Sequence, residues 1–375
     1  MITMATDNKD KVLNVPNLRF PEFTEEWKTV FIGDILNIGN GKDYKLLNPG
    51  CIPVFGTGGY MLSVDNFLYD GESVLIGRKG TINKPFYYSG KFWTVDTLFY
   101  THSFNEVLPK FVYGLFQNIN WDLYNEASGV PSLSKSTIEK IRCNIPTIKE
   151  QSKIAKLLFL LDRRIETQNK IIEKLESLIK GICNKLLFAD NGKPVRLIDI
   201  LTERTEKTKE NNQHEVLSST VKGIFSQREY FSKDIASENN IGYKIIRLYD
   251  IVLSPQNLWM GNINYNEKFK IGIVSPSYKI FSIKAEFDKR FVAFMLKTHR
   301  ALYNYMLVSE QGASVVRRNL NMEAFEQLVF KMPLYDKQRE IGKTLSFLQS
   351  RLELETEIKS DYEQQKKYLL TEMFI

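Results

Sequence analysis

The feature that most constrains this chain is a heptad pattern of apolar residues running from Ile154 to Leu186. Apolar residues there recur in alternating steps of four and three, and Gln168 is the one polar member of the series. A pattern sustained over several heptads is typical of a helix packed along its length against another helix. The predicted seam comprises Ile154, Leu158, Leu161, Ile165, Gln168, Ile172, Leu175 and Ile179.

The same segment occurs a second time. Pro146, Gln151 and Ile154 recur 187 positions later (333 − 146 = 187) as Pro333, Gln338 and Ile341, and the register continues without a gap to the last residue. The second seam comprises Ile341, Leu345, Leu348 and Leu352, and then becomes polar. We interpret the chain as a tandem duplication in which each half ends in a long helix, and we expect the polar second helix to depend on the first.

These repeats predict an α+β fold with a pseudo-two-fold tandem arrangement. The expected parts are globular domains at 1–146 and 191–333 and helices at 147–190 and 334–375, with the two helices antiparallel as a coiled coil. Thr147 and Glu150 form a candidate capping box at the first helix, which would be roughly 60 Å long at about 1.5 Å per residue. Gly192 and Pro194 are typical of its end.

Shorter patterns predict the elements of the globular domains. The stretch Pro53–Tyr60 indicates a strand followed by a glycine-rich loop. Aromatic and β-branched residues at Phe92–Tyr100 indicate one strand, with Ile271–Ile283 as its counterpart in the second half. Apolar spacing indicates helices at 111–116 and 290–296.

Composition narrows the class of function. The chain has 51 Lys and Arg against 44 Asp and Glu, a net charge of +7, which favours a polyanionic partner without establishing one. Its three cysteines and three histidines are scattered, so neither a disulfide framework nor a metal site is expected. The N-terminal segment lacks an apolar signal core, and no window is apolar enough to span a bilayer. We therefore expect a cytoplasmic protein.

Three short motifs look catalytic but stand in the wrong context. Gly56 and Gly58 resemble the loop of an S-adenosylmethionine methyltransferase, yet no helix is expected after them. Gly41-Lys42 and Gly192-Lys193 lack the rest of a Walker loop. Glu357-Ile358-Lys359 has a nuclease-like spacing but falls inside the heptad helix. We conclude that the chain is not an enzyme.

The ordered motifs resemble the specificity subunits of type I restriction-modification enzymes. The resemblance covers nearly the whole chain and rests on the duplicated Pro-(four residues)-Gln-(two)-Ile helices. It rests also on three further motifs in the first half: Pro53-Val54-Phe55-Gly56-Thr57-Gly58-Gly59, Ile76-Gly77-Arg78-Lys79-Gly80-Thr81, and Gly129 with Leu133-Ser134. The second half departs from this pattern, because Ser254-Pro255-Gln256-Asn257 stands where Gly77-Arg78-Lys79-Gly80 would be.

The resemblance implies a non-catalytic subunit whose two globular domains are target recognition domains. Each domain would read one half of a bipartite double-stranded DNA target, and the helices would set the gap between the halves. Two methyltransferase (modification) subunits would grip the helices, with restriction/translocase subunits outside them. The chain itself would hold no cofactor, and S-adenosylmethionine, ATP and Mg²⁺ would be bound by the partner subunits. No membrane association is implied.

Candidate DNA contacts are loop residues that combine positive charge with amide or hydroxyl groups. Phosphate contacts orient a reader and base-edge contacts specify sequence, Arg suiting guanine and Asn or Gln suiting adenine. The candidates are Lys42, Lys45, Thr57, Tyr60, Arg78, Lys79, Thr81 and Asn83 in the first domain, and Lys222, Ser226, Gln227, Arg228, Gln256, Asn257, Asn262, Arg317 and Arg318 in the second. For each candidate, the alternative that it is an ordinary solvated loop residue is at least as well supported. Trp93, Trp121 and Trp259 are interpreted as core.

Two alternatives remain open from the sequence. The chain could be a scaffold whose coiled-coil arms present two protein-binding domains and that recognises no DNA. Gln168 could fix the register of the helix pair or lie near a partner subunit, and we favour the register.

Overall fold

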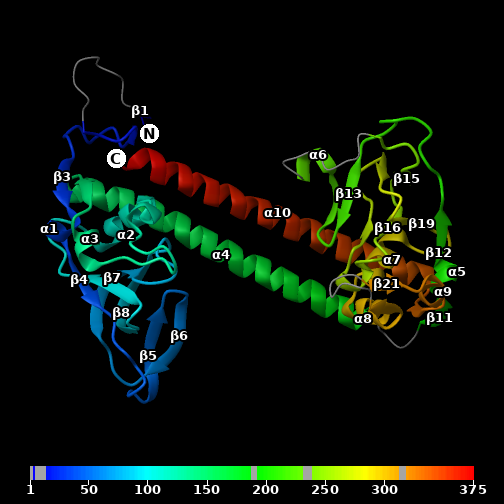
Figure 1. Ribbon diagram of the computed structural model, residues 1–375, viewed down its shortest axis with the longest axis horizontal. Coiled ribbons are helices and arrows are strands. Elements are labelled where there is room, and N and C mark those ends of the chain that lie inside the picture. Colours follow the sequence, from blue (N-terminus) through cyan, green and yellow to red (C-terminus); the bar gives the residue numbers. More distant parts are fainter. Residues whose placement is uncertain (1–2, 5–13, 187–191, 231–238, 312–317) are drawn as a thin grey trace. The chain divides into compact units, whose positions relative to one another are not determined.

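The computed structural model describes residues 3–4, 14–186, 192–230, 239–311 and 318–375 (Figure 1). The chain divides into two compact units. Unit 1 is Met1–Lys170 with Thr356–Ile375, and unit 2 is Ile171–Glu355. Each unit therefore combines one globular domain with parts of both long helices, and together they make a mixed α+β protein of two domains.

Unit 1 is built on a six-stranded sheet. Its strand order is β4 (Asn37–Asn40), β9 (Leu98–His102), β7 (Tyr69–Gly77), β8 (Phe86–Thr94), β5 (Pro49–Gly56) and β6 (Gly59–Val64). All neighbours are antiparallel except β5 and β8. The apolar run Val74–Ile76 is fully buried in β7, which gives the sheet its centre.

The single strand expected at Phe92–Tyr100 is wrong. The chain leaves β8 after Thr94, turns at 95–97 and returns as β9 from Leu98, and Leu98 N donates to Val95 O at 3.0 Å. The turn contains neither Gly nor Pro, so the run of β-prone residues hid it. The reversal makes β9 the neighbour of β7 and places the turn at one end of the sheet.

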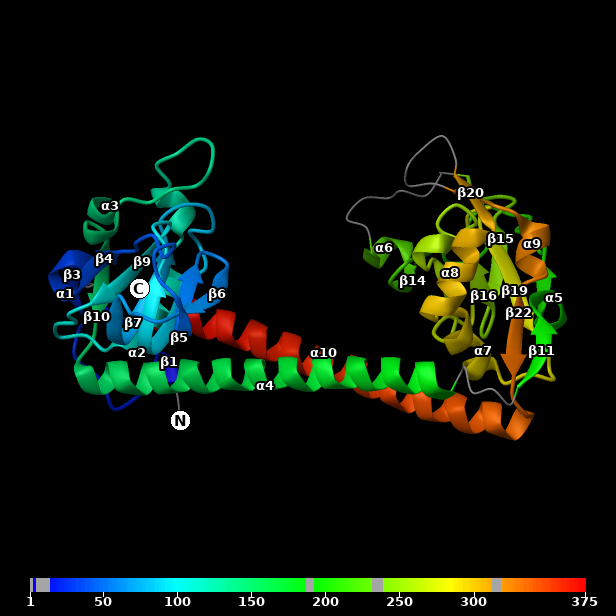
Figure 2. The same ribbon diagram turned by 90° about the horizontal axis from the view of Figure 1, so that it is seen from below.

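Short elements complete unit 1. The antiparallel pair of β3 (Lys28–Phe31) and β10 (Arg142–Ile145) joins segments far apart in sequence. The other elements are β1 (Thr3–Met4), β2 (Leu18–Arg19), α1 (Ile32–Ile35), α2 (Pro109–Asn118), a 3-10 turn at Trp121–Tyr124 and α3 (Lys135–Glu139). The core centres on Trp27, Phe111, Phe116 and Trp121, and α2 packs against the first turns of helix α4 (Figure 2). Trp121 is core as expected.

Two helices of 39 residues each dominate the secondary structure: α4 (Ile148–Leu186) and α10 (Tyr335–Met373). In unit 1, Leu158 and Leu161 of α4 share the core with Leu369 and Met373 of α10. Asp162 of α4 forms an ion pair with Lys366 of α10. The beginning of α4 thus contacts the end of α10 within this unit.

The structure does not show the capping box predicted for Thr147 and Glu150, because the Glu150 carboxylate bonds to residues outside the helix. Glu150 is 1% exposed, and its carboxylate accepts hydrogen bonds from Arg19 Nε at 2.7 Å and Nη2 at 2.8 Å. Trp27 Nε1 also donates to it at 3.4 Å. A buried carboxylate needs such charge-assisted partners, and these lie more than a hundred residues away, beyond the reach of a local motif.

Unit 2 has a smaller sheet of order β12 (Leu201–Arg204), β19 (Lys279–Ile283), β16 (Ile251–Leu253) and β17 (Ile263–Tyr265). Four further pairs surround it: β11 (Lys193–Arg196) with β22 (Val329–Met332), β13 (Leu217–Thr220) with β14 (Gly223–Ser226), β15 (Lys244–Arg247) with β18 (Ile271–Val274), and β20 (Ser309–Gln311) with β21 (Arg318–Leu320). The prediction of a single strand at Ile271–Ile283 is also wrong, because a turn at 275–278, which contains Pro276, separates β18 from β19.

Short helices complete the described part of unit 2. They are α5 (Leu197–Ile200), α6 (Gln227–Tyr230), α7 (Lys289–Leu296), α8 (His299–Leu307) and α9 (Met322–Glu326), with a 3-10 turn at Leu258–Met260. Phe291 and Met295 of α7 share a buried cluster with Ile341 and Leu345 of α10. Ile182 of α4 packs against the same cluster.

The repeated glutamines make matching bonds in the two units. In unit 1, Gln151 Oε1 accepts from Leu108 N at 2.8 Å, and its Nε2 donates to Pro146 O at 2.9 Å. In unit 2, Gln338 Oε1 accepts from Asp288 N at 3.0 Å, and its Nε2 donates to Pro333 O at 2.8 Å. Leu108 and Asp288 are the N-cap residues of α2 and α7. Each glutamine therefore ties a domain helix to the start of a long helix.

Candidate nucleic-acid interface

Several loops of unit 1 meet at one end of the six-stranded sheet, which we call the loop end. The pairs Gly77–Leu98 and Asn40–Phe99 bring the ends of β7 and β4 to the start of β9. The short 95–97 turn joins that start to the end of β8, where Thr94 pairs with Phe55 at the end of β5. The segments that follow β4, β5, β7 and β8 therefore leave the sheet side by side. Six of the eight first-domain candidates lie in these loops, and Tyr60 adjoins them on β6; Lys45 is treated separately below.

Backbone hydrogen bonds fix these loops to one another. Arg78 N donates to Thr97 O at 2.8 Å, and Arg78 O accepts from Leu133 N at 2.9 Å. Lys42 N donates to Thr94 O at 2.8 Å, and Trp93 Nε1 donates to Lys42 O at 2.8 Å. The loop at 129–133 is thereby attached to the loop that follows β7, so the loop end is an ordered surface.

Two glycines allow this close packing. A Cβ at Gly77 would stand 2.1 Å from Thr81 O, and one at Gly41 would stand 1.8 Å from Val95 O. Both contacts are with backbone atoms, which cannot move aside cheaply. The glycine at the start of the Gly77-Arg78-Lys79-Gly80-Thr81 motif is thus needed for the turn that presents Arg78 and Lys79.

The loop end carries the cationic side chains of Lys42, Arg78 and Lys79, together with exposed carboxylates at Asp43 and Asp96. Lys42 and Lys79 are exposed, and Arg78 is half-buried with its guanidinium carbon 5.9 Å from the centre of the Phe99 ring. Arg78 Nη1 also donates to Asp96 O at 3.4 Å. A guanidinium held over a ring loses less conformational freedom on binding. This arrangement would allow Lys42 and Lys79 to contact DNA phosphates. It would also allow the oriented guanidinium of Arg78 to hydrogen-bond the edge of a base.

The remaining first-domain candidates differ in their surroundings. Tyr60 and Asn83 are exposed, and Thr57 and Thr81 are half-exposed. Lys45 belongs to the 41–48 loop, whose far end is bonded to the opposite end of β6, since Asn48 Nδ2 donates to Asp65 Oδ2 at 2.9 Å. The hydrogen bonds therefore do not place Lys45 with the others. Lys84, which is also exposed beside Asn83, was not among the candidates.

In unit 2 the corresponding sheet end carries Gln256 and Arg318. Gln256 follows β16, the counterpart of β7, and its carbonyl accepts from Arg318 N at 3.2 Å. The Arg318 guanidinium carbon lies 5.0 Å from the centre of the Trp259 ring. Trp259 is half-buried rather than fully core. Asn257 is half-buried beside Gln256, and Arg317 lies outside the described residues.

Other second-domain candidates are held elsewhere. Asn262 is 5% exposed, its Oδ1 accepts from Ser219 Oγ at 2.9 Å, and its Nδ2 donates to Ser219 O at 3.1 Å. Its amide is therefore occupied inside the fold. Ser226 is buried in β14, Gln227 is half-buried and Arg228 is exposed on α6, while Lys222 lines a cavity next to Asn264. The hydrogen bonds do not bring these residues to Gln256.

The predicted seam residues differ in burial along the helices. Ile154, Leu158, Leu161, Gln168, Ile341 and Leu345 are buried. Ile165, Ile172, Leu175, Ile179, Leu348 and Leu352 are half-buried. The buried apolar members are the ones that contact a globular core. Gln168 is 6% exposed, a burial compatible with both readings of this residue.

Within the described ranges, no cluster of His, Cys, Asp and Glu is suited to hold a metal ion.

Burial raises the pKa of the Cys143 thiol to about 12, and the nearby Asp34 adds to the shift. No helix among the described residues is both long and apolar enough to cross a membrane.

Comparison with known proteins gives a consistent result. Residues 24–177 match the family model of the type I restriction modification DNA specificity domain. The chain is 28% identical over 174 residues to the type I restriction enzyme EcoDI specificity subunit of Escherichia coli, covering 44% of this chain and 38% of that protein. It is 25% identical over 214 residues to the MjaVIII specificity subunit of Methanocaldococcus jannaschii, covering 50% of this chain and 47% of that protein. The matches thus span less than half of either relative.

The fold is also similar to a solved structure. The crystal structure of the type I restriction-modification S subunit from M. genitalium superposes with a TM-score of 0.68 at 15% identity, covering 96% of this chain and 99% of that one. The match at residues 24–177 contains every motif of the loop end. Residues 24–177 are therefore similar to type I restriction modification DNA specificity domains, and the predicted resemblance of the chain to type I specificity subunits is confirmed.

Proposed function

We propose that the chain is the DNA sequence-specificity subunit of a type I restriction-modification complex and performs no catalysis itself. The observation that carries the proposal is the cationic loop end of unit 1, which lies inside the matched specificity domain. Lys42 and Lys79 would contact phosphates, and Arg78 would face a base. Catalysis would belong to partner subunits, which would bind S-adenosylmethionine, ATP and Mg²⁺.

Each unit would read one half of a bipartite target. The equivalent bonds of Gln151 and Gln338 support a duplication. Gln256 also lies in the loop after β16, as Lys79 lies in the loop after β7. We infer that α4 and α10 pair as an antiparallel coiled coil that sets the gap between the two half-sites. The ion pair of Asp162 with Lys366 in unit 1 supports this pairing.

The proposed partners are double-stranded DNA, two methyltransferase subunits and the restriction subunits that join them in the cytoplasm. The test is to co-express the chain with the methyltransferase subunit of its own system and to map methylated adenines in the host DNA. One split sequence with a fixed gap is expected. Methylation without sequence preference, or none, would defeat the proposal.

The alternative is a scaffold that binds no DNA, and the salt dependence of DNA affinity distinguishes it from the proposed function. A protein that contacts several phosphates loses DNA affinity steeply as salt rises, because counterions are no longer released as favourably. The complex should therefore bind its mapped target less tightly at about 200 mM than at about 50 mM salt, by orders of magnitude. A scaffold would show no DNA binding at either salt concentration.

A further inference from the structure

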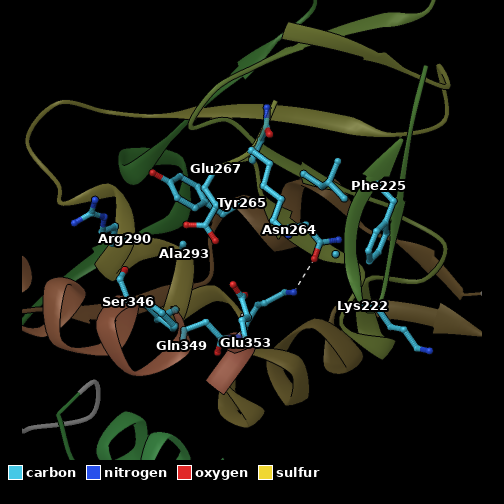
Figure 3. A pocket seen from close by; sticks show the side chains of 16 residues that line it. Lys222, Phe225, Asn264, Tyr265, Glu267, Arg290, Ala293, Ser346, Gln349 and Glu353 are labelled. Atoms are coloured by element: carbon cyan, nitrogen blue, oxygen red, sulfur yellow. Dashed lines mark hydrogen bonds between the residues drawn. The ribbon is translucent and has the colours of Figure 1, made fainter. Parts of the chain in front are cut away.

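A cavity of about 240 Å³ lies in unit 2 where α7 faces α10 (Figure 3). Aromatic side chains of Phe225, Tyr265 and Phe294 form much of its wall. Burial raises the pKa of the Tyr265 hydroxyl, and the carboxylate of Glu267 adds to the shift. The wall thus combines a partly desolvated aromatic surface, suited to an apolar side chain, with polar and charged groups.

Cationic groups outnumber carboxylates around this cavity. Lys222, Lys268, Arg290 and Lys297 line it, against Glu267 and Glu353. Lys297 Nζ donates to Asn264 Oδ1 at 2.6 Å. Although its side chain keeps contact with solvent, the surrounding walls desolvate the ammonium and lower the pKa of Lys297, an effect that the nearby Glu267 opposes.

Unit 1 has a cavity of about 370 Å³ between α2 and α4. Lys110, Lys156 and Arg163 line it together with Phe159 and one carboxylate, Glu72. That carboxylate accepts a hydrogen bond from the Tyr87 hydroxyl. The Lys110 ammonium lies 4.7 Å from the centre of the Phe159 ring. This cavity therefore also combines an aromatic wall with an excess of positive charge.

The two cavities occupy equivalent places in their units. Each lies between a domain helix and a long helix that a buried glutamine ties together. Lys110 and Arg290 are the second residues of α2 and α7. Leu160, 48% exposed, lines the unit 1 cavity. Its counterpart 187 positions later is Phe347, which is 72% exposed and follows Ser346, a lining residue of the unit 2 cavity.

We propose that these cavities are one docking site present twice, and that each receives an acidic segment with an apolar anchor from a protein partner bound in two copies. Charge complementarity selects the acidic segment, and exposed large apolar residues beside a cavity are typical of a protein contact. Apart from Lys222, a candidate DNA contact that lines the unit 2 cavity, the cavities are set apart from the loops proposed to meet DNA. Glu72 precedes the buried centre of β7, and Tyr265 pairs with Ile251 at the start of β16, whereas the candidate loops follow the ends of those strands.

The partner of the proposed function is the methyltransferase subunit, so this inference rests on that function. The experiment combines the purified full chain with that subunit and measures the stoichiometry by native mass spectrometry. One variant carries Lys156→Glu and Arg163→Glu in unit 1, and another carries Lys268→Glu and Arg290→Glu in unit 2. The control carries Lys42→Glu and Lys79→Glu at the loop end, where the change in charge is the same.

Each cavity variant should lose one of two bound methyltransferase subunits, and the combined variant should lose both. The control should keep two and lose DNA affinity instead. Leu160→Ser and Phe347→Ser should each weaken one of the two binding events by at least about tenfold, without a charge change. Thermal unfolding checks that every variant remains folded.

Two copies retained by all cavity variants at unchanged affinity would overturn the inference while leaving the proposed function intact. Two copies retained together with weakened DNA binding would show that the cavities serve nucleic acid, which also overturns it. A wild-type chain that recruits no methyltransferase would instead refute the proposed function, and with it this partner for the cavities.

Discussion

Replacement of Arg78 by alanine should relax sequence preference at one base pair of one half-site. The backbone at this position is fixed by bonds of Arg78 N to Thr97 O and Arg78 O to Leu133 N, so the change removes the guanidinium without moving the loop. A bidentate contact of Arg with guanine is worth about 1–3 kcal/mol of discrimination. Because about 1.4 kcal/mol is a factor of ten, the preference should fall roughly 5- to 150-fold.

The assay is methylation by the assembled complex of a DNA library randomised in both half-sites. Arg78→Lys keeps the charge but loses the fork, so it should behave like the alanine variant in preference and lose less overall affinity. The matched control is Lys79→Ala on the next residue, which is exposed. It should weaken binding to all sequences alike and reduce the salt slope by about one.

Three outcomes would refute the reasoning. Arg78→Ala could leave all base preferences unchanged, it could change preferences in both half-sites, or Lys79→Ala could alter one base preference as strongly. Thermal unfolding serves as the check on folding, since loss of the Arg78 contact with Phe99 should cost only about 0.5–1 kcal/mol at a partly exposed site.

Further predictions concern residues that the structure assigns to the fold. Glu150→Ala should lower the free energy of unfolding by about 3–5 kcal/mol in urea titrations, because it leaves the largely enclosed Arg19 guanidinium without its carboxylate; a loss below about 1 kcal/mol would contradict this. Gln151→Ala should cost about 1–3 kcal/mol by the same measurement, because Leu108 N and Pro146 O lose their partner, and an unchanged midpoint would count against it. Asn262→Ala should lower the thermal stability of the chain while leaving the methylated sequence the same, and an altered sequence at normal stability would mean that Asn262 reads DNA after all.

The long helices α4 and α10 lie where the sequence pattern predicts helices. The repeated glutamines at 151 and 338 were visible as a motif, and they make matching bonds. Local β-propensity did not predict the chain reversal within Phe92–Tyr100. Residues on both sides of the turn at 95–97 are equally β-prone, so only the pairing of β9 with β7 determines where the chain reverses.

In the candidate site, too, local features could be predicted from the sequence and long-range contacts could not. The loop position of Arg78 and Lys79 could be predicted, because a glycine-bounded loop presents them locally. Burial of Asn262 could not be predicted, because its partner Ser219 lies 43 residues away. The contact of Arg318 with Trp259 likewise joins distant segments, and no local pattern predicts it. Local chemistry nominates residues, and long-range packing decides which of them face solvent.

The most direct test of the account is an exchange of residues 191–333 for the corresponding segment of another specificity subunit, followed by mapping of methylated adenines. The account predicts that one half of the split target changes to the donor's half-site, while the other half and the gap remain. A change in both halves, or in neither, would contradict the claim that each unit reads its own half-site.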